Sequence, residues 1–557
     1  MLTRAIREQR RLLERRDCGC RCSSKPANTY LSNISLQRLV GTLAQVTIDG
    51  SHLTLDQVLQ VSRDKAHTVI TEKAIARTRN GRKALERLLR EKEVIYGVNT
   101  GFGALSNFTI PTDDLKHLQT NLIRSHSASV GQPHSSDVVR AMMLLRANTL
   151  LKGNSGIRPE VVSTIVRLLN KEIHPYIPEK GSVGASGDLS PLSHMALVLL
   201  GEGSAESRGR WIPGKKALEI SGIVPLRLEA KEGLALNNGT QQMVAMGCLC
   251  LFDAYQLLAT MEASLALSLE ALKGWADAFD ERIQRLRPHP GQQIVAEHVR
   301  GLVRGSRSVR TIESDDPSNG RPQDPYSFRC APQVMGASKD AFDFTKQILE
   351  VEMNSATDNP LVFPEDGVCI SGGNFHGQPV AMGLDIMALA ISYLANMSER
   401  RISALLDTSL NNGLPPFLVG RRSKPGLSSG LMAVQYTATS LVSESKLLTH
   451  PASSDSIPTS SNFEDFVSMG PGAAHKARMI LENSQYVASI ELLVAAQGVD
   501  LRGAKGLGVG TRRVFQAVRR KVPSLSEDRS SHEDIEKIRK MVRDGEIAKI
   551  VAQATGS

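Results

Sequence analysis

The feature that most restricts the fold of this chain is a series of long helical segments in its second half. Apolar residues recur there with helical periodicity in six segments. These segments are 239–273, 292–303, 334–353, 377–407, 430–448 and 472–499. Several reach or exceed about twenty residues, a length typical of a bundle of long helices. The sequence therefore predicts a mainly α protein with a long-helix bundle as its core.

The regions on either side of this bundle differ from it in composition. A short strand-like segment near Ala44 leads into a helix, for which Thr54 and Asp56 are suitable N-terminal caps. Two glycine-rich loops follow before the bundle begins. We expect four regions: a basic and disordered extension at 1–43, a smaller N-terminal domain at 44–238, the bundle core at 239–507, and a charged C-terminal helical region at 508–557.

The distribution of charge argues against a nucleic-acid-binding protein. The chain has 557 residues and a net charge of +10, and residues 1–25 carry half of that charge. A basic tail on a nearly neutral body is not the basic groove that nucleic acid requires. We expect no membrane span either, because Asp253, Glu262 and Glu270 interrupt the most apolar run, Met243–Leu272.

The cysteines and the N-terminus favour a cytoplasmic protein. The seven cysteines are scattered, and an odd, scattered set is typical of reduced thiols. The Cys18-x-Cys20-x-Cys22 cluster lacks further ligands at metal-binding spacing, so no metal site is predicted. The N-terminus also lacks the apolar core of a secretory signal.

The most informative string is the Gly/Ser-rich 181–190 loop, "GSVGASGDLS", which runs directly into an apolar helix. A loop of this kind before a helix suggests anion binding, but the Gly-Lys-Ser/Thr of a phosphate-binding loop is absent. A nucleophilic serine in a Gly-x-Ser-x-Gly turn would need a different spacing. The spacing alone leaves a plain loop as an open alternative.

Ala185-Ser186-Gly187 within this loop resembles the self-processing triad of the histidine/phenylalanine ammonia-lyase family. The resemblance implies that the three residues cyclise with loss of two waters to a methylideneimidazolone, with no external cofactor and no metal. The residue types suit that chemistry, because Gly187 and Ala185 are small and Ser186 supplies the hydroxyl that is eliminated. The fold it implies is a fumarase/aspartase-like helical bundle with a smaller N-terminal domain that carries the electrophile.

Further strings resemble the same family between about Leu53 and Gly506, and they imply the other catalytic and binding residues. "YGVNTGFG" implies Tyr96 as the base, and "NNGT" places Asn238 beside the electrophile. The remaining motifs, "QDPYSFR" and "SGGNFHGQP", supply Gln323, Tyr326, Arg329 and Phe375. A packed tyrosine, a solvated arginine and a core phenylalanine are the alternatives for Tyr96, Arg329 and Phe375. His194 and His376 are interpreted as structural.

The expected substrate rests on two positions. His126, in "NLIRSH", and Glu464, in "SNFEDF", resemble the residues that histidine lyases place near the imidazole ring. A carboxylate accepts an imidazole N–H, whereas an unpaired one facing a benzene ring would be costly. We therefore expect deamination of L-histidine to urocanate and ammonia, the first step of histidine degradation.

The chain also departs from the histidine-lyase pattern. Phe463 and Phe466 flank Glu464 where other residues are usual, and Ala331 replaces a common Gln. These departures keep open a phenylalanine or tyrosine ammonia-lyase, or an aromatic aminomutase. A non-enzymatic lyase-fold scaffold is a further alternative, although Tyr96 and Ser186 are both present. The family resemblance also implies a homotetramer whose active sites combine loops from three subunits, so an isolated monomer is expected to be inactive.

Overall fold

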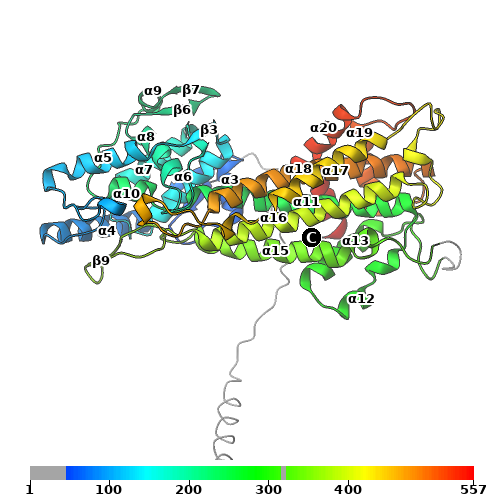
Figure 1. The fold of residues 1–557 in the computed structure, drawn as a ribbon, viewed down its shortest axis with the longest axis horizontal. Coiled ribbons are helices and arrows are strands. Elements are labelled where there is room, and N and C mark those ends of the chain that lie inside the picture. The colour runs from blue at the N-terminus through cyan, green and yellow to red at the C-terminus, as the bar shows by residue number, and fades with distance from the viewer. Residues whose placement is uncertain (1–44, 315–320, 557) are drawn as a thin grey trace, which may run out of the picture.

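The computed structural model describes residues 45–314 and 321–556. The expected extension at 1–43, with its three cysteines, lies outside these residues. The described chain is an elongated, mostly helical molecule with the long helices running side by side along its length (Figure 1). The predicted fold class, a mainly α protein with a long-helix bundle, is confirmed.

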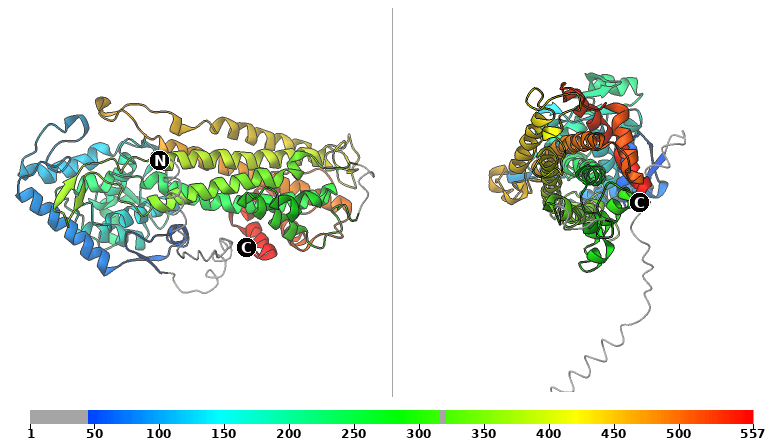
Figure 2. Two further views of the ribbon diagram at one scale, coloured as in Figure 1. Left: turned by 90° about the horizontal axis from the view of Figure 1, so that it is seen from below. Right: turned by 90° about the vertical axis from the view of Figure 1, so that its right-hand side faces the viewer.

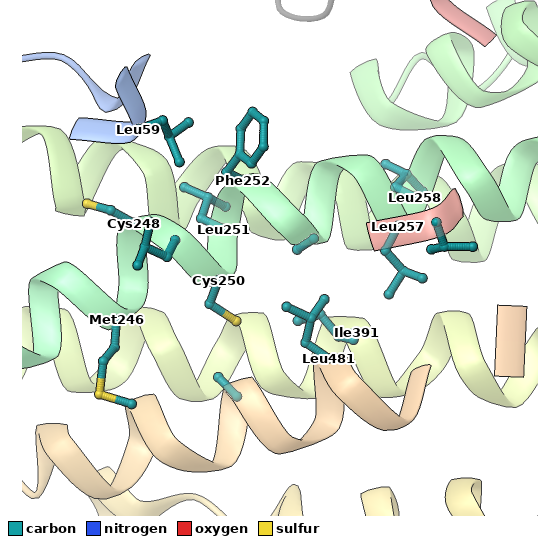
Figure 3. Packing of buried hydrophobic residues seen from close by; sticks show 14 of the residues in the cluster. Leu59, Met246, Cys248, Cys250, Leu251, Phe252, Leu257, Leu258, Ile391 and Leu481 are labelled. Atoms are coloured by element: carbon teal, nitrogen blue, oxygen red, sulfur yellow. The ribbon is translucent and has the colours of Figure 1, made fainter. Parts of the chain in front are cut away.

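The bundle contains the six predicted long helices, each with ends close to those expected. They are α11 (Gln241–Leu272), α13 (Pro290–Val303), α15 (Ala331–Glu352), α16 (Gln378–Leu406), α17 (Met432–Leu448) and α18 (Gly470–Arg502). Helix α11 is buried on nearly all sides, as expected for a helix that is apolar around its whole circumference. Figure 3 shows Met246, Cys248 and Cys250 of α11 in the core, with Cys250 the one of the three drawn next to Ile391 of α16 and Leu481 of α18.

A buried ion pair also joins the bundle helices. Arg401 of α16 donates two hydrogen bonds to Glu491 of α18, at 2.6 and 2.7 Å, and both side chains are fully buried. Three serine hydroxyls complete the carboxylate's partners, from Ser264 and Ser268 of α11 and Ser398 of α16. A buried charge pair needs such satisfaction, so this network fixes the register of three helices.

Helices α11 and α16 are long and apolar enough to cross a membrane by length and composition alone. Most of each apolar window is buried inside the protein, however. Their apolar character is therefore accounted for by their central places in the bundle, as the sequence predicted for the Met243–Leu272 run.

The N-terminal region is a cluster of shorter helices at one end of the bundle (Figures 1 and 2). Its helices are α3 (Leu55–Ser62), α4 (Glu72–Arg90), α5 (Leu115–His126), α6 (Ser136–Leu150), α7 (Pro159–Asn170), α8 (Leu189–Leu199), α9 (Gly214–Ile220) and α10 (Glu232–Asn237). Thr54 caps α3 through a capping box with Gln57, which confirms the predicted cap.

The strands are short and form small sheets. Parallel β1 (Gln45–Ile48) and β2 (His67–Ile70) make one pair, and β3 (Val130–Pro133) with β5 (Pro178–Lys180) makes an antiparallel pair. The antiparallel order β4-β6-β7 joins Ile173–Pro175, Ser204–Ser207 and Arg210–Pro213. The hairpin of β8 (Leu361–Phe363) and β9 (Val368–Ile370) follows α15 in sequence but lies beside α4 (Figure 1). The segment after α15 therefore returns to the N-terminal region.

The C-terminal helices are α19 (Val509–Lys521), α20 (His532–Arg543) and α21 (Glu546–Thr555). Their apolar faces belong to the same core as α11, α13 and α18. Short α-helices within the described residues also include α12 (Glu281–Arg285) and α14 (Tyr326–Arg329). The four-region division of the chain remains a prediction.

Candidate active site

A cavity of about 930 Å³ opens where distant segments of the chain meet. It lies between the 181–190 loop, the end of α5, the segment 96–105 and the loop 459–466. The sequence-predicted site residues that line it are Tyr96, His126, Ala185, Ser186, Asn238, Phe375 and Glu464. Most of the predicted site is thus assembled within one chain.

The backbone around Gly187 is folded too tightly for any other residue. Its φ is +73°, and a β-carbon there would lie 2.1 Å from the Gly239 carbonyl oxygen. The backbones of Ala185 and Gly187 form an isolated bridge with each other, and Gly187 forms a second bridge with Gly239. The loop therefore folds Gly187 back onto Ala185. These residues fit the predicted cyclisation, because that reaction joins the Gly187 nitrogen to the Ala185 carbonyl carbon.

Asn238 holds the middle of this turn. Its Nδ2 donates a hydrogen bond to the Ser186 carbonyl oxygen at 3.0 Å. The Asn238 carbonyl in turn accepts from the buried guanidinium of Arg146 at 2.8 Å, which also donates to Gln241 at 2.7 Å. The Arg146 hydrogen bond therefore holds the Asn238 backbone in place, and the Asn238 side chain keeps Ser186 in one orientation.

Asp188 ties the 181–190 loop to the first turn of α11. Its Oδ2 accepts from the backbone N–H groups of Gln242 at 2.8 Å and Met243 at 3.1 Å, as a capping carboxylate does. Complete burial nevertheless raises the pKa of Asp188 to about 7, because desolvation outweighs these hydrogen bonds. The central helix of the bundle and the reactive loop are thus held to each other directly.

Glu464 reaches the 181–190 loop from the other side of the cavity. Its Oε1 accepts a hydrogen bond from Ser186 Oγ at 3.2 Å, and its Oε2 accepts one from Thr459 Oγ1 at 2.6 Å. The turn between Thr459 and Glu464 has three consecutive residues with left-handed φ, Ser460, Ser461 and Asn462, at 51°, 53° and 66°. Backbone of this kind is strained in non-glycine residues and is concentrated at functional sites.

Tyr96 faces the same cavity, half-buried. Its hydroxyl oxygen accepts from the Gly103 N–H at 3.0 Å. Burial raises the pKa of Tyr96, the negative charge of Glu464 raises it further, and the Gly103 hydrogen bond opposes them. Within a single chain Tyr96 is therefore a neutral phenol at neutral pH, not the phenolate that a base requires.

His126 ends α5 with its ring turned toward the cavity. Its Nδ1 lies 3.0 Å from the Leu122 carbonyl oxygen, which can only accept, so Nδ1 carries the proton. Burial lowers the pKa of His126 and favours the neutral ring. The Nε2 atom is then a hydrogen-bond acceptor, so the cavity contains two acceptors, His126 Nε2 and the Glu464 carboxylate.

The aromatic residues that interrupt the expected pattern also reach the cavity. Phe463 and Phe466 line it, together with Phe375 and His376. The rings of His376 and Phe466 stack with centroids 6.0 Å apart, and His376 Nε2 contacts the Phe466 carbonyl oxygen at 3.2 Å. His194 lies away from the cavity, where its Nε2 accepts from the Ser129 N–H at 3.2 Å. Both histidines have local packing partners.

Four predicted site residues do not line this cavity: Gly187, which lies in the turn behind Ser186, and Gln323, Tyr326 and Arg329, which are remote from it.

The remote group is Gln323, Tyr326 and Arg329. They precede α15, whose 22 residues span about 33 Å. The opposite end of α15 is the one near the reactive loop, since Glu352 accepts a 2.6 Å hydrogen bond from Thr240. One chain therefore cannot bring Arg329 to Ser186.

The Arg329 side chain nonetheless has local partners at the far end of the bundle. Its guanidinium lies 4.5 Å from the centre of the Tyr326 ring, and its Nε donates to the Asp324 carbonyl at 3.1 Å. Asp324 is held in turn by the Trp275 N–H at 2.6 Å. Tyr326 is 68% exposed, so this pair presents an open surface.

The sequence reasoning missed several residues that shape the cavity. Thr459 and Ser460 orient Glu464 and the Tyr96 loop, and Asp188 anchors the 181–190 loop. Asp188 directly precedes α8, but its side chain caps α11 instead, so a local capping signal would have indicated the wrong helix. Nothing local marked Thr459 and Ser460, because their partners are far away in the sequence.

Cysteines do not contribute to the cavity lining. The four cysteines of the described residues are free thiols, and burial raises the pKa of Cys248 and Cys250. Among residues 45–314 and 321–556, no group of three or more potential metal ligands occurs.

A long-helix bundle, with a tightly turned Ala-Ser-Gly loop held against the first turn of the central helix α11, is the arrangement of a class of enzymes that contains ammonia-lyases and aminomutases. Solved structures agree. The tyrosine aminomutase of Streptomyces globisporus superposes with a TM-score of 0.87 at 38% identity, over 92% of this chain and 99% of that one. The histidine ammonia-lyase of Trypanosoma cruzi gives 0.83 at 42% identity, over 92% and 95%.

The sequence comparisons identify the family. The aromatic amino acid lyase profile matches residues 53–520. A histidine ammonia-lyase of Caldanaerobacter subterraneus subsp. tengcongensis is 49% identical over 511 residues, which are 92% of this chain and 99% of that protein. The chain belongs to the aromatic amino acid lyase family and is a carbon–nitrogen lyase. A non-enzymatic scaffold is thereby set aside.

Proposed function

We propose that this protein is an ammonia-lyase that converts L-histidine to urocanate and ammonia, the first step of histidine degradation. The observation that carries the proposal is the presence of His126 and Glu464 on one cavity beside Ser186. The similar proteins from Caldanaerobacter subterraneus and from Alkaliphilus metalliredigens are both named histidine ammonia-lyase, at 49% and 48% identity.

The two acceptors in the cavity suit an imidazole ring. The Glu464 carboxylate would accept one N–H of the substrate imidazole. His126 Nε2 would accept the second N–H when the substrate imidazole is protonated. A benzene ring has no donor for either group and would leave the Glu464 carboxylate desolvated and unpaired. The pair thus favours histidine over phenylalanine.

The electrophile in this proposal is a methylideneimidazolone formed from Ala185, Ser186 and Gly187. When formed, it supplies an electrophilic alkene that makes the loss of ammonia accessible by covalent catalysis. The folded-back Gly187 and the Asn238 hydrogen bond to the Ser186 carbonyl suit its formation and its retention. No external cofactor or metal is part of the proposal.

The protein's own residues would then bind the amino acid and move one proton. Tyr96 would remove the proton from the β-carbon of the substrate. Arg329 would pair with the substrate carboxylate in a bidentate fork, and Tyr326 and Gln323 would lie beside it. The raised pKa of Tyr96 in one chain means that this base needs a nearby cation in the working enzyme.

A homotetramer with shared active sites would meet both requirements. Arg329 and Tyr326 lie at the end of α15 remote from the cavity, on an exposed surface. A neighbouring subunit that presents this surface to the cavity would bring a guanidinium to the substrate and to Tyr96. We also propose a cytoplasmic location, which accords with the four free cysteines of the described chain.

The second candidate is a phenylalanine or tyrosine lyase, or an aminomutase of the same family. It is favoured by Phe463 and Phe466 in the cavity lining and by the likeness to the Streptomyces globisporus tyrosine aminomutase. The phenyl groups of Phe463 and Phe466 in the lining would favour binding of an apolar ring.

An ultraviolet assay separates these functions. Purified protein is given L-histidine, L-phenylalanine or L-tyrosine, and the conjugated acrylate product is followed, with Ser186→Ala as control. Urocanate from histidine alone, absent in the variant, is the expected outcome. Cinnamate or coumarate as the main product would establish a phenylalanine or tyrosine lyase. A β-amino acid found by chromatography of the same reactions, without acrylate absorbance, would indicate an aminomutase.

A further inference from the structure

Glu464 contacts the one hydroxyl that formation of the electrophile must remove. Ser186 Oγ donates a hydrogen bond to Glu464 Oε1 at 3.2 Å, across 278 positions of sequence. The carbonyl of Ser186 is held at the same time by Asn238 at 3.0 Å. Both polar groups of Ser186 that project from the turn are therefore occupied, one by each side of the cavity.

The carboxylate of Glu464 is itself held in place. Thr459 Oγ1 donates to its Oε2 at 2.6 Å, and the backbones of the two residues pair, Thr459 N–H to Glu464 oxygen at 3.0 Å and Glu464 N–H to Thr459 oxygen at 3.3 Å. The strained left-handed residues between them close this loop. Asp465, the next residue, is exposed and lines the cavity without reaching the 181–190 loop. Only Glu464 of this acidic pair is aimed at Ser186.

Formation of the electrophile from Ala185, Ser186 and Gly187 removes two waters and needs no oxidant. The Gly187 nitrogen bonds to the Ala185 carbonyl carbon, and that carbonyl oxygen leaves as water with the hydrogens of the Gly187 and Ser186 nitrogens. The Ser186 Cα–H electron pair then forms the Cα=Cβ bond while the hydroxyl leaves Cβ. The Cα proton and the hydroxyl make the second water.

Elimination of this kind depends on the orientation of the C–O bond that breaks. A free serine side chain samples three staggered positions of its hydroxyl, and only a suitable one aligns with the Cα–H bond. A hydrogen bond to a fixed carboxylate selects one position before the reaction, which is the advantage of orientation in catalysis.

We infer that Glu464 acts twice at this site: it orients the Ser186 hydroxyl during formation of the electrophile, and it is released to bind the substrate ring when that hydroxyl is lost. Before processing, Oε1 is occupied by Ser186. After processing, Oε1 has lost this donor and accepts the ring N–H of the substrate in its place. The same carboxylate thus makes ring binding dependent on a completed electrophile. This inference rests on the proposed function, since it presumes that the electrophile forms.

The test measures processing by mass rather than by activity. Wild-type protein, Glu464→Ala, Glu464→Gln and Asp465→Ala are each purified at successive times after a short induction in the cold. Intact-mass and peptide spectrometry then give the fraction of chains that have lost the mass of two waters from the peptide containing Ser186. Circular dichroism and gel filtration confirm that each variant is folded and assembled as the wild type.

Glu464→Ala is expected to be processed about tenfold more slowly, the effect of losing one hydrogen bond to a charged group. Glu464→Gln keeps an acceptor oxygen and is expected to be processed at a rate closer to that of the wild type. Asp465→Ala is the matched control, because it removes the adjacent carboxylate without touching Ser186, and its processing is expected to be unchanged.

Two failures are distinguishable. Wild-type protein that keeps its full mass would refute the proposed electrophile itself. Wild-type protein that loses both waters, with Glu464→Ala doing so at the same rate, would overturn only the role of Glu464 in processing. Equal slowing of Glu464→Ala and Asp465→Ala would also overturn it, because the effect would then belong to the general charge of the cavity.

Discussion

Gly103 and Ser460 touch so closely that no side chain fits between the two loops they belong to. A β-carbon at position 103 would lie 2.3 Å from Ser460 Oγ, and Gly103 has a φ of +53°. Ser460 Oγ also accepts from the Ala104 N–H at 3.3 Å, while the Gly103 N–H donates to the Tyr96 hydroxyl. The loop that presents Tyr96 and the loop that presents Glu464 are therefore held together at this point.

Replacing Gly103 by alanine is expected to separate these loops and to lower kcat/KM by on the order of 100-fold, since small misplacements of catalytic groups have effects of that size. Steady-state kinetics measure the loss. Gly209→Ala is the matched control: its φ is also positive, at +74°, but nothing lies within 4 Å of a β-carbon there. It carries the same backbone strain, so an equal loss of activity in both variants would contradict the contact argument.

The second prediction concerns the pH dependence set by Tyr96. Burial and Glu464 raise the pKa of Tyr96, and a base must be deprotonated to act. The active fraction therefore increases as pH rises, and log kcat/KM should climb toward alkaline pH before it levels off. Tyr96→Phe is expected to lower kcat by about 100-fold or more and to remove this alkaline limb.

The control for this pH profile is Tyr176, a tyrosine outside the cavity whose ring packs on Trp211. Tyr176→Phe should leave the profile in place. A wild-type kcat/KM that falls continuously between roughly pH 6 and 9 would argue against a tyrosine base. The pH at which the wild-type profile levels off would measure how far the cation of an assembled neighbour lowers the pKa of Tyr96 from its raised value in a single chain.

Long-range packing explains how much of this molecule could be predicted from its sequence. Five of the six bundle helices bury extensive apolar surface, which leaves a pattern that can be read over many turns, whereas α17 buries only Val434, Ala438 and Ser445 in one chain. Thr54 was predictable because a cap acts on the next turn of the same helix. In both cases the signal and the structure occupy the same short stretch of chain.

In the site, too, the residues within local motifs could be predicted, whereas contacts between distant segments could not. Tyr96, Ser186 and Glu464 could be named from motifs, but the hydrogen bond between Ser186 and Glu464 joins residues 278 apart and leaves no local pattern. The raised pKa of Tyr96 was equally hidden, since it arises from burial by distant segments. Arg329 and Tyr326 were taken from one motif and lie together, but motif order could not reveal that α15 separates both from Ser186 within one chain.

The third prediction concerns the buried carboxyl of Asp188, whose pKa is raised from 3.8 to about 7. The folded state retains this proton between those values while the unfolded state loses it, so the stability contributed by the group is present below pH 3.8 and is lost as pH rises to about 7. The full difference corresponds to about 4 kcal/mol, at 1.36 kcal/mol for each pKa unit. Asparagine resembles the protonated form and keeps one acceptor oxygen for the N–H groups of Gln242 and Met243.

Asp188→Asn should therefore gain stability relative to the parent as pH rises from about 4 to about 7, with no further gain above that. Thermal melts at fixed protein concentration measure the difference. Both proteins carry Ser186→Ala, so that processing of the loop cannot differ between them. Asp465→Asn in the same background changes an exposed carboxyl and is the matched control. The idea fails if Asp188→Asn gains no more stability over this pH range than Asp465→Asn does.

The last prediction tests whether Arg329 reaches the cavity from another subunit. Tyr96→Phe and Arg329→Ala are each expected to be nearly inactive alone. Tyr96 and Glu464 line one cavity of one chain, whereas Arg329 lies at the far end of α15. If sites combine Tyr96 of one subunit with Arg329 of another, coexpression of the two variants creates some mixed sites that carry both native side chains. Activity should then return in the mixed oligomer, purified with a different affinity tag on each chain.

The control for this experiment is the pair Tyr96→Phe and Glu464→Ala. Both changes fall in the cavity of a single chain, so mixing cannot restore a complete site. Recovery in the first pair and none in the second would establish shared sites, whereas recovery in neither would overturn the role of Arg329 in a shared site.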